Sequence, residues 1–169
     1  MNLDQLNALS VQQAFDAFET CCVSTRWINA MIESRPFASV AIMLEVSSQI
    51  WQQSSREDIL QAFEGHPRIG DVESLQKKYA NTSALAGHEQ AGMSDADKET
   101  IQRMASLNTE YFDRFGFIFI VCASGKTAQQ MLALFEARLP NDPVTELSIA
   151  AQEQGKITLL RLQKLVSEL

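Results

Sequence analysis

Residues 64–71, with the sequence Glu-Gly-His-Pro-Arg-Ile-Gly-Asp, contain the side chain best suited to proton transfer. The imidazole of His66 titrates near neutral pH, so it can act as an acid or a base. Pro67 disfavours a helical backbone at the residue before it, which keeps His66 out of a helix interior. Gly65 is typical of the left-handed residue that ends a helix. We therefore expect His66 at a fixed corner between two helices, as a catalytic group or as an exposed corner histidine.

A second polar cluster, Gly-His-Glu-Gln at residues 87–90, interrupts a run of small residues. Glu89 and Gln90 can offer an acceptor and an amide to a ligand, and the alternative is a solvated helix surface. We expect His88 at the surface. A metal site can be drawn from both histidines with Asp71 and Glu89, but no His-x-x-x-His spacing supports it. We therefore expect no metal.

Arg161 interrupts an otherwise apolar stretch at residues 156–162. Its guanidinium either extends to water, which is the commoner case, or is held inward against a carboxylate. Residues 125–127, Gly-Lys-Thr, resemble the end of a phosphate loop. The first glycine of that motif is missing, because position 120 is Ile120, so we expect no nucleotide site.

Composition narrows the class of protein. The 169 residues suffice for one domain with a buried core, and the formal net charge is −7. No run is rich in lysine or arginine, which argues against nucleic acid as a partner. No apolar run approaches the ~20 residues that span a membrane, and the N-terminus lacks the pattern of a signal peptide. Three cysteines form no disulfide framework and indicate a reducing compartment.

Apolar spacing and capping residues predict an all-α domain of about eight helices. Ser55 with Asp58 and Thr127 with Gln130 resemble capping boxes, and Asp142 precedes a proline suited to a first helical position. Residues 81–92 are richer in small and polar residues and give no clear pattern. The expected helices cover residues 10–22, 24–35, 39–52, 55–64, 72–79, 94–115, 127–139 and 143 to the C-terminus.

Residues 117–123, Phe-Ile-Phe-Ile-Val-Cys-Ala, are the one strand-like stretch. A single strand is not stable alone, so we expect a short buried extended segment whose backbone groups need partners, a ligand among them. Gly116 should end the helix before it. In the last helix, Gly155 should mark a bend or a close contact. The residues of that helix expected to face inward are Leu147, Ala150, Ile157, Leu160 and Val166.

Four motifs, taken together, resemble one family. They are residues 65–71 (GHPRIGD), 89–92 (EQAG), 115–123 (FGFIFIVCA), and Lys156-Ile157 with Arg161. In this order and spacing the chain resembles 2-oxo-4-hydroxy-4-carboxy-5-ureidoimidazoline (OHCU) decarboxylase, the last enzyme of urate oxidation to (S)-allantoin in purine catabolism. The resemblance covers nearly the whole chain. It implies an all-helical, cofactor-independent, homodimeric enzyme acting on a small-molecule substrate.

The resemblance also assigns roles by position. The family's catalytic histidine, glutamate and arginine fall on His66, Glu89 and Arg161. The family commonly has Ser-x-x-Glu-Gln, but this chain has Ala86 three residues before the glutamate. The serine hydroxyl is therefore absent, unless Ser83 or Thr82 replaces it. The implied substrate contacts are Pro67, Ala86, Gly87, His88, Gln90 and the backbone of Ile118, Phe119, Ile120, Val121 and Cys122.

Two other functions compete with decarboxylation. A helical module that binds a ureido or purine-like ligand without converting it would share the site but tolerate loss of His66. A metal-dependent hydrolase of allantoin-type rings would lose activity with a chelator. The C-terminal tripeptide Ser-Glu-Leu has a glutamate where a peroxisomal signal has a basic residue, so we expect a cytoplasmic location.

Overall fold

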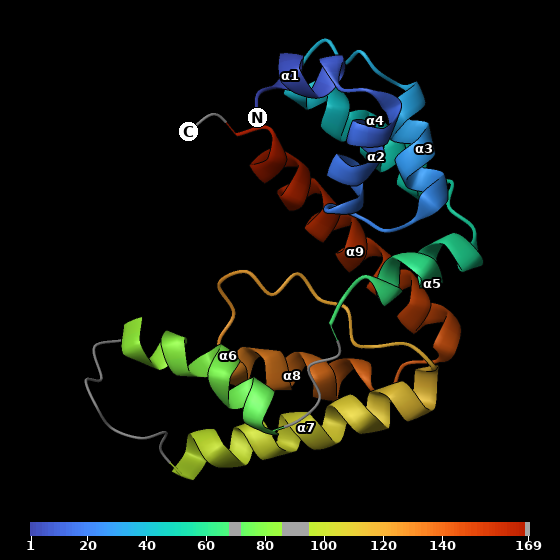
Figure 1. Ribbon diagram of the computed structural model, residues 1–169. Helices are drawn as coiled ribbons and strands as arrows, with labels where there is room; N and C mark the ends of the chain where they lie inside the picture. Colours follow the sequence, from blue (N-terminus) through green and yellow to red (C-terminus); the bar gives the residue numbers. More distant parts are fainter. Residues whose placement is uncertain (68–71, 86–94, 168–169) are drawn as a thin grey trace. The chain divides into compact units, whose positions relative to one another are not determined.

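Helices make up all the regular structure in the part of the chain that the structure describes (Figure 1). The computed structural model describes residues 1–67, 72–85 and 95–167, except for the side chains of residues 78, 80–85, 95 and 96. These ranges contain no strand, which confirms the all-α prediction. Their nine helices are α1 (Leu3–Ala8), α2 (Val11–Glu19), α3 (Thr25–Glu33), α4 (Val40–Gln52), α5 (Arg56–Glu64), α6 (Val72–Leu85), α7 (Asp95–Phe115), α8 (Ala128–Arg138) and α9 (Pro143–Leu165).

The expected capping residues begin three of these helices. Ser55 and Asp58 form a reciprocal capping box at α5, as do Thr127 and Gln130 at α8. The Asp142 carboxylate accepts hydrogen bonds from backbone N–H groups in the first turn of α9, which opens with a proline. Each cap satisfies N–H groups that have no partner within the helix, which is why these sequence signals are dependable.

The short N-terminal helix α1 was not predicted. Asn2 and Gln5 form a capping box at its start, a signal that the sequence does carry. Leu6 is the one buried residue among its six. A helix this short shows too little apolar periodicity to be recognised from its spacing.

The chain divides into two compact units. Unit 1 comprises Met1–His66, Ile120–Cys122 and Ala150–Leu169. Within it, α3 packs against α2, α4 and α5. The fully buried indole of Trp27 lies edge-on to Phe18, with ring centroids 5.9 Å apart, and its Nε1 donates to Ser47 Oγ at 3.1 Å. This apolar core supports the helices of unit 1.

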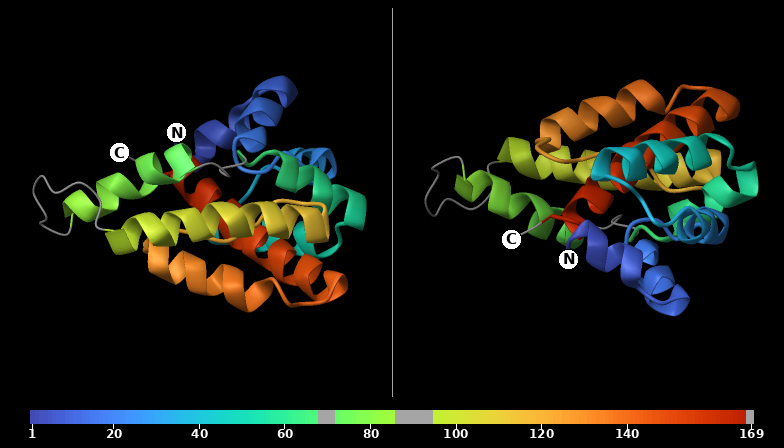
Figure 2. Two further views of the ribbon diagram at one scale, coloured as in Figure 1. Left: turned by 90° about the horizontal axis from the view of Figure 1, so that it is seen from below. Right: turned by 90° about the horizontal axis from the view of Figure 1, so that it is seen from above.

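Unit 2 comprises Pro67–Phe119 and Ala123–Ile149, and in it α7 lies beside α8 and also packs against α6 (Figures 1 and 2). The buried ring of Tyr111 forms edge contacts with Phe119 and Phe135, which stack on each other with centroids 3.7 Å apart. The buried carboxylate of Glu146 pairs with Arg138, whose Nη2 lies 2.6 Å from Oε1. The described core of unit 2 therefore combines these aromatic rings with aliphatic side chains such as Ile101 and Leu107, and it contains the Arg138–Glu146 ion pair.

Residues 117–123 connect α7 to α8 without forming a helix or a strand. Gly116, with φ of 77°, ends α7 as expected, because this left-handed conformation suits glycine. Within the described ranges, no helix combines the length and the apolar character needed to cross a bilayer.

Helix α9 confirms part of the predicted inward face. Ala150 and Val166 are buried, but Leu160 is 39% exposed, so its predicted inward position is wrong. The buried stripe of this helix includes Gln154 and Thr158, two polar residues that a search for apolar spacing passes over. Their burial follows from hydrogen bonds described below.

Gly155 marks a close contact, one of its two predicted roles. A Cβ at this position would lie 3.2 Å from Cδ1 of Trp51, whose Nε1 donates to the Ala151 carbonyl at 2.9 Å. The absence of a side chain at Gly155 therefore lets the indole ring approach the backbone of α9.

Candidate active site

His66 immediately follows the residue that ends α5, and it is half-buried. The left-handed prediction for Gly65 is wrong, because its φ of −72° is right-handed. The glycine has a different cause: a Cβ there would lie 2.7 and 2.8 Å from the two methyl groups of Val23. The backbone N–H of His66 donates to the Phe63 carbonyl at 3.1 Å. Packing against Val23 and this hydrogen bond hold the corner in place.

The His66 ring contacts α9. Its Nε2 lies 2.5 Å from Oε1 of Gln154, a residue that is fully buried. The Gln154 amide Nε2 donates to Thr158 Oγ1 at 3.1 Å. The Thr158 hydroxyl in turn donates to the Gln154 backbone carbonyl at 3.0 Å. Consecutive hydrogen bonds therefore connect the imidazole to side chains one turn apart on α9.

Arg161 is half-buried, and its Nη1 donates to the Cys21 carbonyl at 3.4 Å. Among the described residues, no carboxylate lies within ion-pair distance of its guanidinium. The partner that the described residues offer this arginine is therefore a backbone carbonyl, and Glu89, the carboxylate of the predicted site, lies outside them. Most of the five N–H donors of the guanidinium are thus left for other partners, and an anionic ligand would suit them.

Burial and the charge of Arg161 control the protonation of this site. Burial lowers the pKa of His66 below 6.5; the hydrogen bond between its ring and the Gln154 amide oxygen opposes this shift, and the nearby Arg161 charge adds to it. Burial raises the pKa of Cys21 to about 11 and also raises the pKa of Cys22. At neutral pH the site therefore holds a neutral imidazole, two protonated thiols and one fixed cation.

Gln154 and Thr158 are the site residues that the sequence-based prediction missed. With Arg161 they lie at positions i, i+4 and i+7 of α9, which is one face of a helix. Three polar residues at this spacing, of which Thr158 and Arg161 interrupt an apolar stretch, were the available signal. It is a weak signal, because glutamine and threonine are common on solvated helix faces.

The structure brings together only some of the predicted residues. His66 and Arg161 both belong to unit 1, where Arg161 is close enough to affect the pKa of His66. Pro67 is exposed. Ile120 is buried, while Ile118, Phe119, Val121 and Cys122 are partly buried. Glu89, with the rest of residues 86–90, lies outside the described residues.

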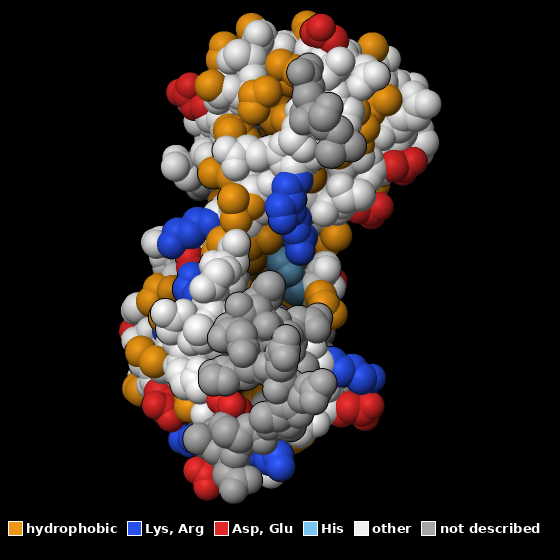
Figure 3. Space-filling view, turned by 90° about the vertical axis from the view of Figure 1, so that its left-hand side faces the viewer, with side chains coloured by type: hydrophobic (Ala, Val, Ile, Leu, Met, Phe, Trp, Pro, Cys, Tyr) orange, Lys and Arg blue, Asp and Glu red, His pale blue; other side chains and the backbone are white. Residues whose placement is uncertain are grey.

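The described residues contain no group of three or more histidine, cysteine, aspartate or glutamate side chains placed to hold a metal ion. Asp71, His88 and Glu89 of the alternative metal set lie outside the described residues. All three cysteines lie within them and carry thiols. On the face shown in Figure 3, a histidine side chain reaches the surface, and acidic and basic side chains are interspersed.

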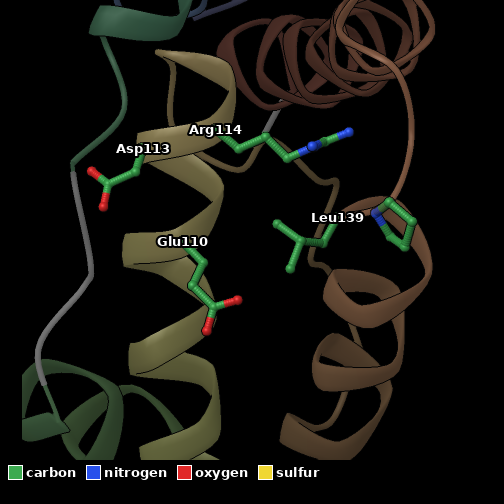
Figure 4. Close-up of a pocket in the computed structure, with 5 residues that line it drawn as sticks. Glu110, Asp113, Arg114 and Leu139 are labelled. Carbon is green, nitrogen blue, oxygen red and sulfur yellow. The ribbon is translucent and has the colours of Figure 1, made fainter.

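Two hollows in unit 2 contain none of the predicted site residues. The larger, about 870 Å³, is lined by Glu110, Asp113 and Arg114 of α7 and by Leu139 and Pro140 after α8 (Figure 4). The Arg114 guanidinium donates to the Asn141 carbonyl at 2.8 Å.

The smaller hollow, about 500 Å³, adjoins the Gly-Lys-Thr stretch at the start of α8. There the Thr127 hydroxyl accepts the Gln130 backbone N–H at 3.2 Å. This threonine therefore serves as a helix cap.

Comparison with known proteins places these residues in a family context. The family model for OHCU decarboxylase matches residues 7–163. The chain is 36% identical over 155 residues to the uric acid degradation bifunctional protein TTL of Arabidopsis thaliana, covering 90% of this chain and 47% of that protein. It is 32% identical over 175 residues to the 2-oxo-4-hydroxy-4-carboxy-5-ureidoimidazoline decarboxylase of Amia calva, covering 98% and 95%. The chain thus spans about half the length of the first relative and nearly all of the second.

The fold is also similar to that of a solved protein. A crystal structure of OHCU decarboxylase in the presence of (S)-allantoin matches with a TM-score of 0.73 and 36% sequence identity. The match covers 90% of this chain and 99% of the solved chain.

Proposed function

We propose, from the premise that the chain belongs to the OHCU decarboxylase family, that it converts 2-oxo-4-hydroxy-4-carboxy-5-ureidoimidazoline to (S)-allantoin, the final step of urate oxidation. The family match over residues 7–163 is the observation that carries this proposal. The neutral imidazole of His66 and the guanidinium of Arg161, both in unit 1, supply groups that such a reaction needs.

The substrate itself explains why the reaction can proceed without a cofactor. It bears a hydroxyl and a carboxylate on one ring carbon, next to a carbon–nitrogen double bond. When the bond to the carboxylate breaks, CO2 leaves and its electron pair moves toward the imine nitrogen, which takes up a proton. The resulting enol then becomes a ring carbonyl as its hydroxyl proton is lost and the ureido-bearing carbon is protonated. The protein must position the ring, move these protons and protonate that carbon from one face.

We assign the proton transfers to His66 and propose that Glu89 orients its imidazole. Arg161 would hold the substrate carboxylate or the ureido carbonyl, since its remaining N–H donors suit either group. The other substrate contacts that we propose are Pro67, residues 86–88, Gln90 and the backbone of residues 118–122. Ala86 would provide no hydroxyl, so substrate affinity here rests more heavily on the other contacts.

The test is circular dichroism during urate turnover, with urate oxidase and the hydrolase that follows it supplied and EDTA in excess. We expect this protein to accelerate formation of the (S)-allantoin signal, and His66→Asn to abolish that acceleration. Arg161→Gln should weaken it strongly. Arg103→Gln is the matched control, because Arg103 is half-exposed and its ion-pair partners among the described residues are exposed carboxylates of unit 2.

Each other outcome points to a different function. An unchanged spontaneous rate with racemic product would contradict catalysis and support a module that only binds the ligand. Loss of activity in EDTA would support the metal-dependent alternative.

We also propose that the chain forms a single cytoplasmic domain that works as a homodimer. The resemblance to the family supports the dimer, and the cysteine usage supports a reducing compartment. Light scattering coupled to size-exclusion chromatography would measure the mass of the particle directly. A mass of 18.9 kDa, that of one chain, would contradict the dimer.

A further inference from the structure

Hydrogen-bond donors and acceptors fix the orientation of the Gln154 amide. The Thr158 hydroxyl has one proton, which it donates to the Gln154 backbone carbonyl at 3.0 Å. Its oxygen must therefore act as the acceptor toward the Gln154 side chain, 3.1 Å away. Only the amide nitrogen of that side chain can donate. The amide oxygen is consequently the atom that faces His66.

This orientation determines where the proton of His66 lies. The imidazole Nε2 is 2.5 Å from the Gln154 oxygen, which can only accept a hydrogen bond. Nε2 must then carry the proton. In a neutral imidazole one ring nitrogen is protonated and the other has a lone pair, so the lone pair lies on Nδ1.

We propose that Gln154 is a positioning residue that holds His66 as its Nε2–H tautomer, so that Nδ1 is the atom that exchanges protons with the substrate. This inference rests on the proposed function, and because both ring nitrogens are then engaged, it leaves Glu89 to act on the imidazole through its charge and not through a hydrogen bond. Nδ1 takes the proton of the substrate hydroxyl after CO2 has left, giving an imidazolium whose Nε2–H is still held by Gln154. The same proton then passes to the ureido-bearing carbon as the carbon–carbon double bond becomes single and the enol C–O bond becomes a carbonyl, and His66 returns to its neutral form.

The surroundings in unit 1 favour this neutral tautomer. Gln154 is fully buried and Thr158 is 3% exposed, so water does not compete for the amide. The charge of Arg161 disfavours a second positive charge on the ring, and the thiols of Cys21 and Cys22, which interact with Arg161, are protonated at neutral pH. No other side chain of unit 1 hydrogen-bonds the imidazole in the described part of the chain.

Nuclear magnetic resonance can identify the tautomer without substrate. Long-range proton–nitrogen correlations of the 15N-labelled full chain distinguish a protonated Nε2 from a protonated Nδ1. The chain has two histidines, so the spectrum of His66→Asn assigns the signals of His66. We expect a protonated Nε2 and a bare Nδ1 at pH 7.5. A protonated Nδ1 would overturn the proposal, whether or not the protein is a decarboxylase.

A threonine series tests the positioning role. Thr158→Val removes the hydroxyl that orients the amide, so the tautomers should mix and kcat should fall roughly 10- to 100-fold, with KM little changed. Thr158→Ser should restore both the single tautomer and kcat. Thr109→Val is the matched control, because Thr109 is exposed and its hydroxyl donates, within the described part of the chain, to a carbonyl of its own helix. If Thr158→Val kept the tautomer and kcat of the unmodified chain, the positioning role would be excluded.

The two measurements separate the two proposals. A chain that shows the Nε2–H tautomer but no decarboxylation retains the positioning by Gln154 and loses the proposed function. Decarboxylation with the opposite tautomer retains the function and removes the role of Gln154.

Discussion

A half-buried imidazole near a fixed cation stays neutral at lower pH than an imidazole in water. Burial and the charge of Arg161 place the pKa of His66 below 6.5, although the Gln154 hydrogen bond opposes this shift. If the neutral ring accepts the substrate proton, kcat/KM should fall on the acid side with an apparent pKa below 6.5. The pH profile measured with limiting substrate checks this prediction, and a midpoint at or above 6.5 would contradict it.

The same lowered pKa links stability to pH. Between the folded-state pKa of His66 and its unfolded value of 6.5, the unfolded chain binds more protons than the folded chain. The contribution of His66 to the free energy of unfolding is therefore at its maximum above pH 6.5. It is lost as the pH falls through that window. Urea unfolding of His66→Asn should lack this part of the pH dependence, which gives an independent check on the assignment of the acid limb.

At the residue scale, the sequence identifies groups that stand out from their surroundings. His66 lies beside a proline, and Arg161 interrupts an apolar stretch, so both were found. Gln154 and Thr158 were not found, because an amide and a hydroxyl in a helix are unremarkable until a partner from another element is known. The conformation of Gly65 was mispredicted for the same reason, since Val23 lies 42 positions earlier in the chain.

Within unit 2, the buried ion pair joins the start of α9 to the end of α8. Glu146→Gln should leave the Arg138 cation buried beside a neutral amide and remove the charged acceptor of the Tyr111 hydroxyl. We expect a loss of about 3–5 kcal/mol in the free energy of unfolding, measured by urea denaturation. Glu73→Gln is the matched control, because Glu73 and Lys77 are exposed and lie 3.2 Å apart.

The control substitution should cost less than about 1 kcal/mol, since an exposed pair is screened by water. Equal losses of unfolding free energy in the two variants would mean that the buried Arg138–Glu146 pair stabilises the fold no more than the exposed Glu73–Lys77 pair does. A near-zero loss in Glu146→Gln alone would indicate that the aromatic rings around Tyr111, with the guanidinium 4.2 Å above the Phe119 ring, suffice to stabilise this region.

At the element scale, helix starts were more predictable than buried faces. Ser55, Thr127 and Asp142 act through hydrogen bonds within four residues, so local sequence determines them. The inward face of α9 depends on what packs against it. Leu160 is exposed while Gln154 is buried, because His66 and Thr158 satisfy the amide of Gln154. Apolar periodicity carries no information about such polar partners.

At the scale of the whole molecule, the chain passes between the two compact units at 66/67, 119/120, 122/123 and 149/150. The last of these boundaries falls inside α9, so unfolding of one unit alone would interrupt a continuous helix. We therefore predict a single cooperative transition. Both tryptophans, Trp27 and Trp51, belong to unit 1, so their fluorescence reports on that unit, whereas far-ultraviolet circular dichroism reports on all helices.

Coincident midpoints in urea by the two signals would support the single domain that we expect from the sequence. A fluorescence transition that precedes or follows loss of helix would contradict it. The all-α class was predictable because it needs only local helix signals, and the structure confirms it. The number of cooperative units depends on contacts distant in sequence, so it remains a prediction until this measurement is made.

The packing of Gly65 against Val23 constrains how relatives of this chain can diverge. A Cβ at position 65 would lie within 2.8 Å of both valine methyl groups, so one small volume is shared by two positions. Substitutions at the two sites should therefore occur as coupled pairs: a side chain can be gained at 65 only in lineages where 23 has become smaller. Position 65 directly precedes His66, so its packing affects where the imidazole lies. Covariation of positions 65 and 23 would therefore show selection for that placement, although neither residue needs to contact substrate.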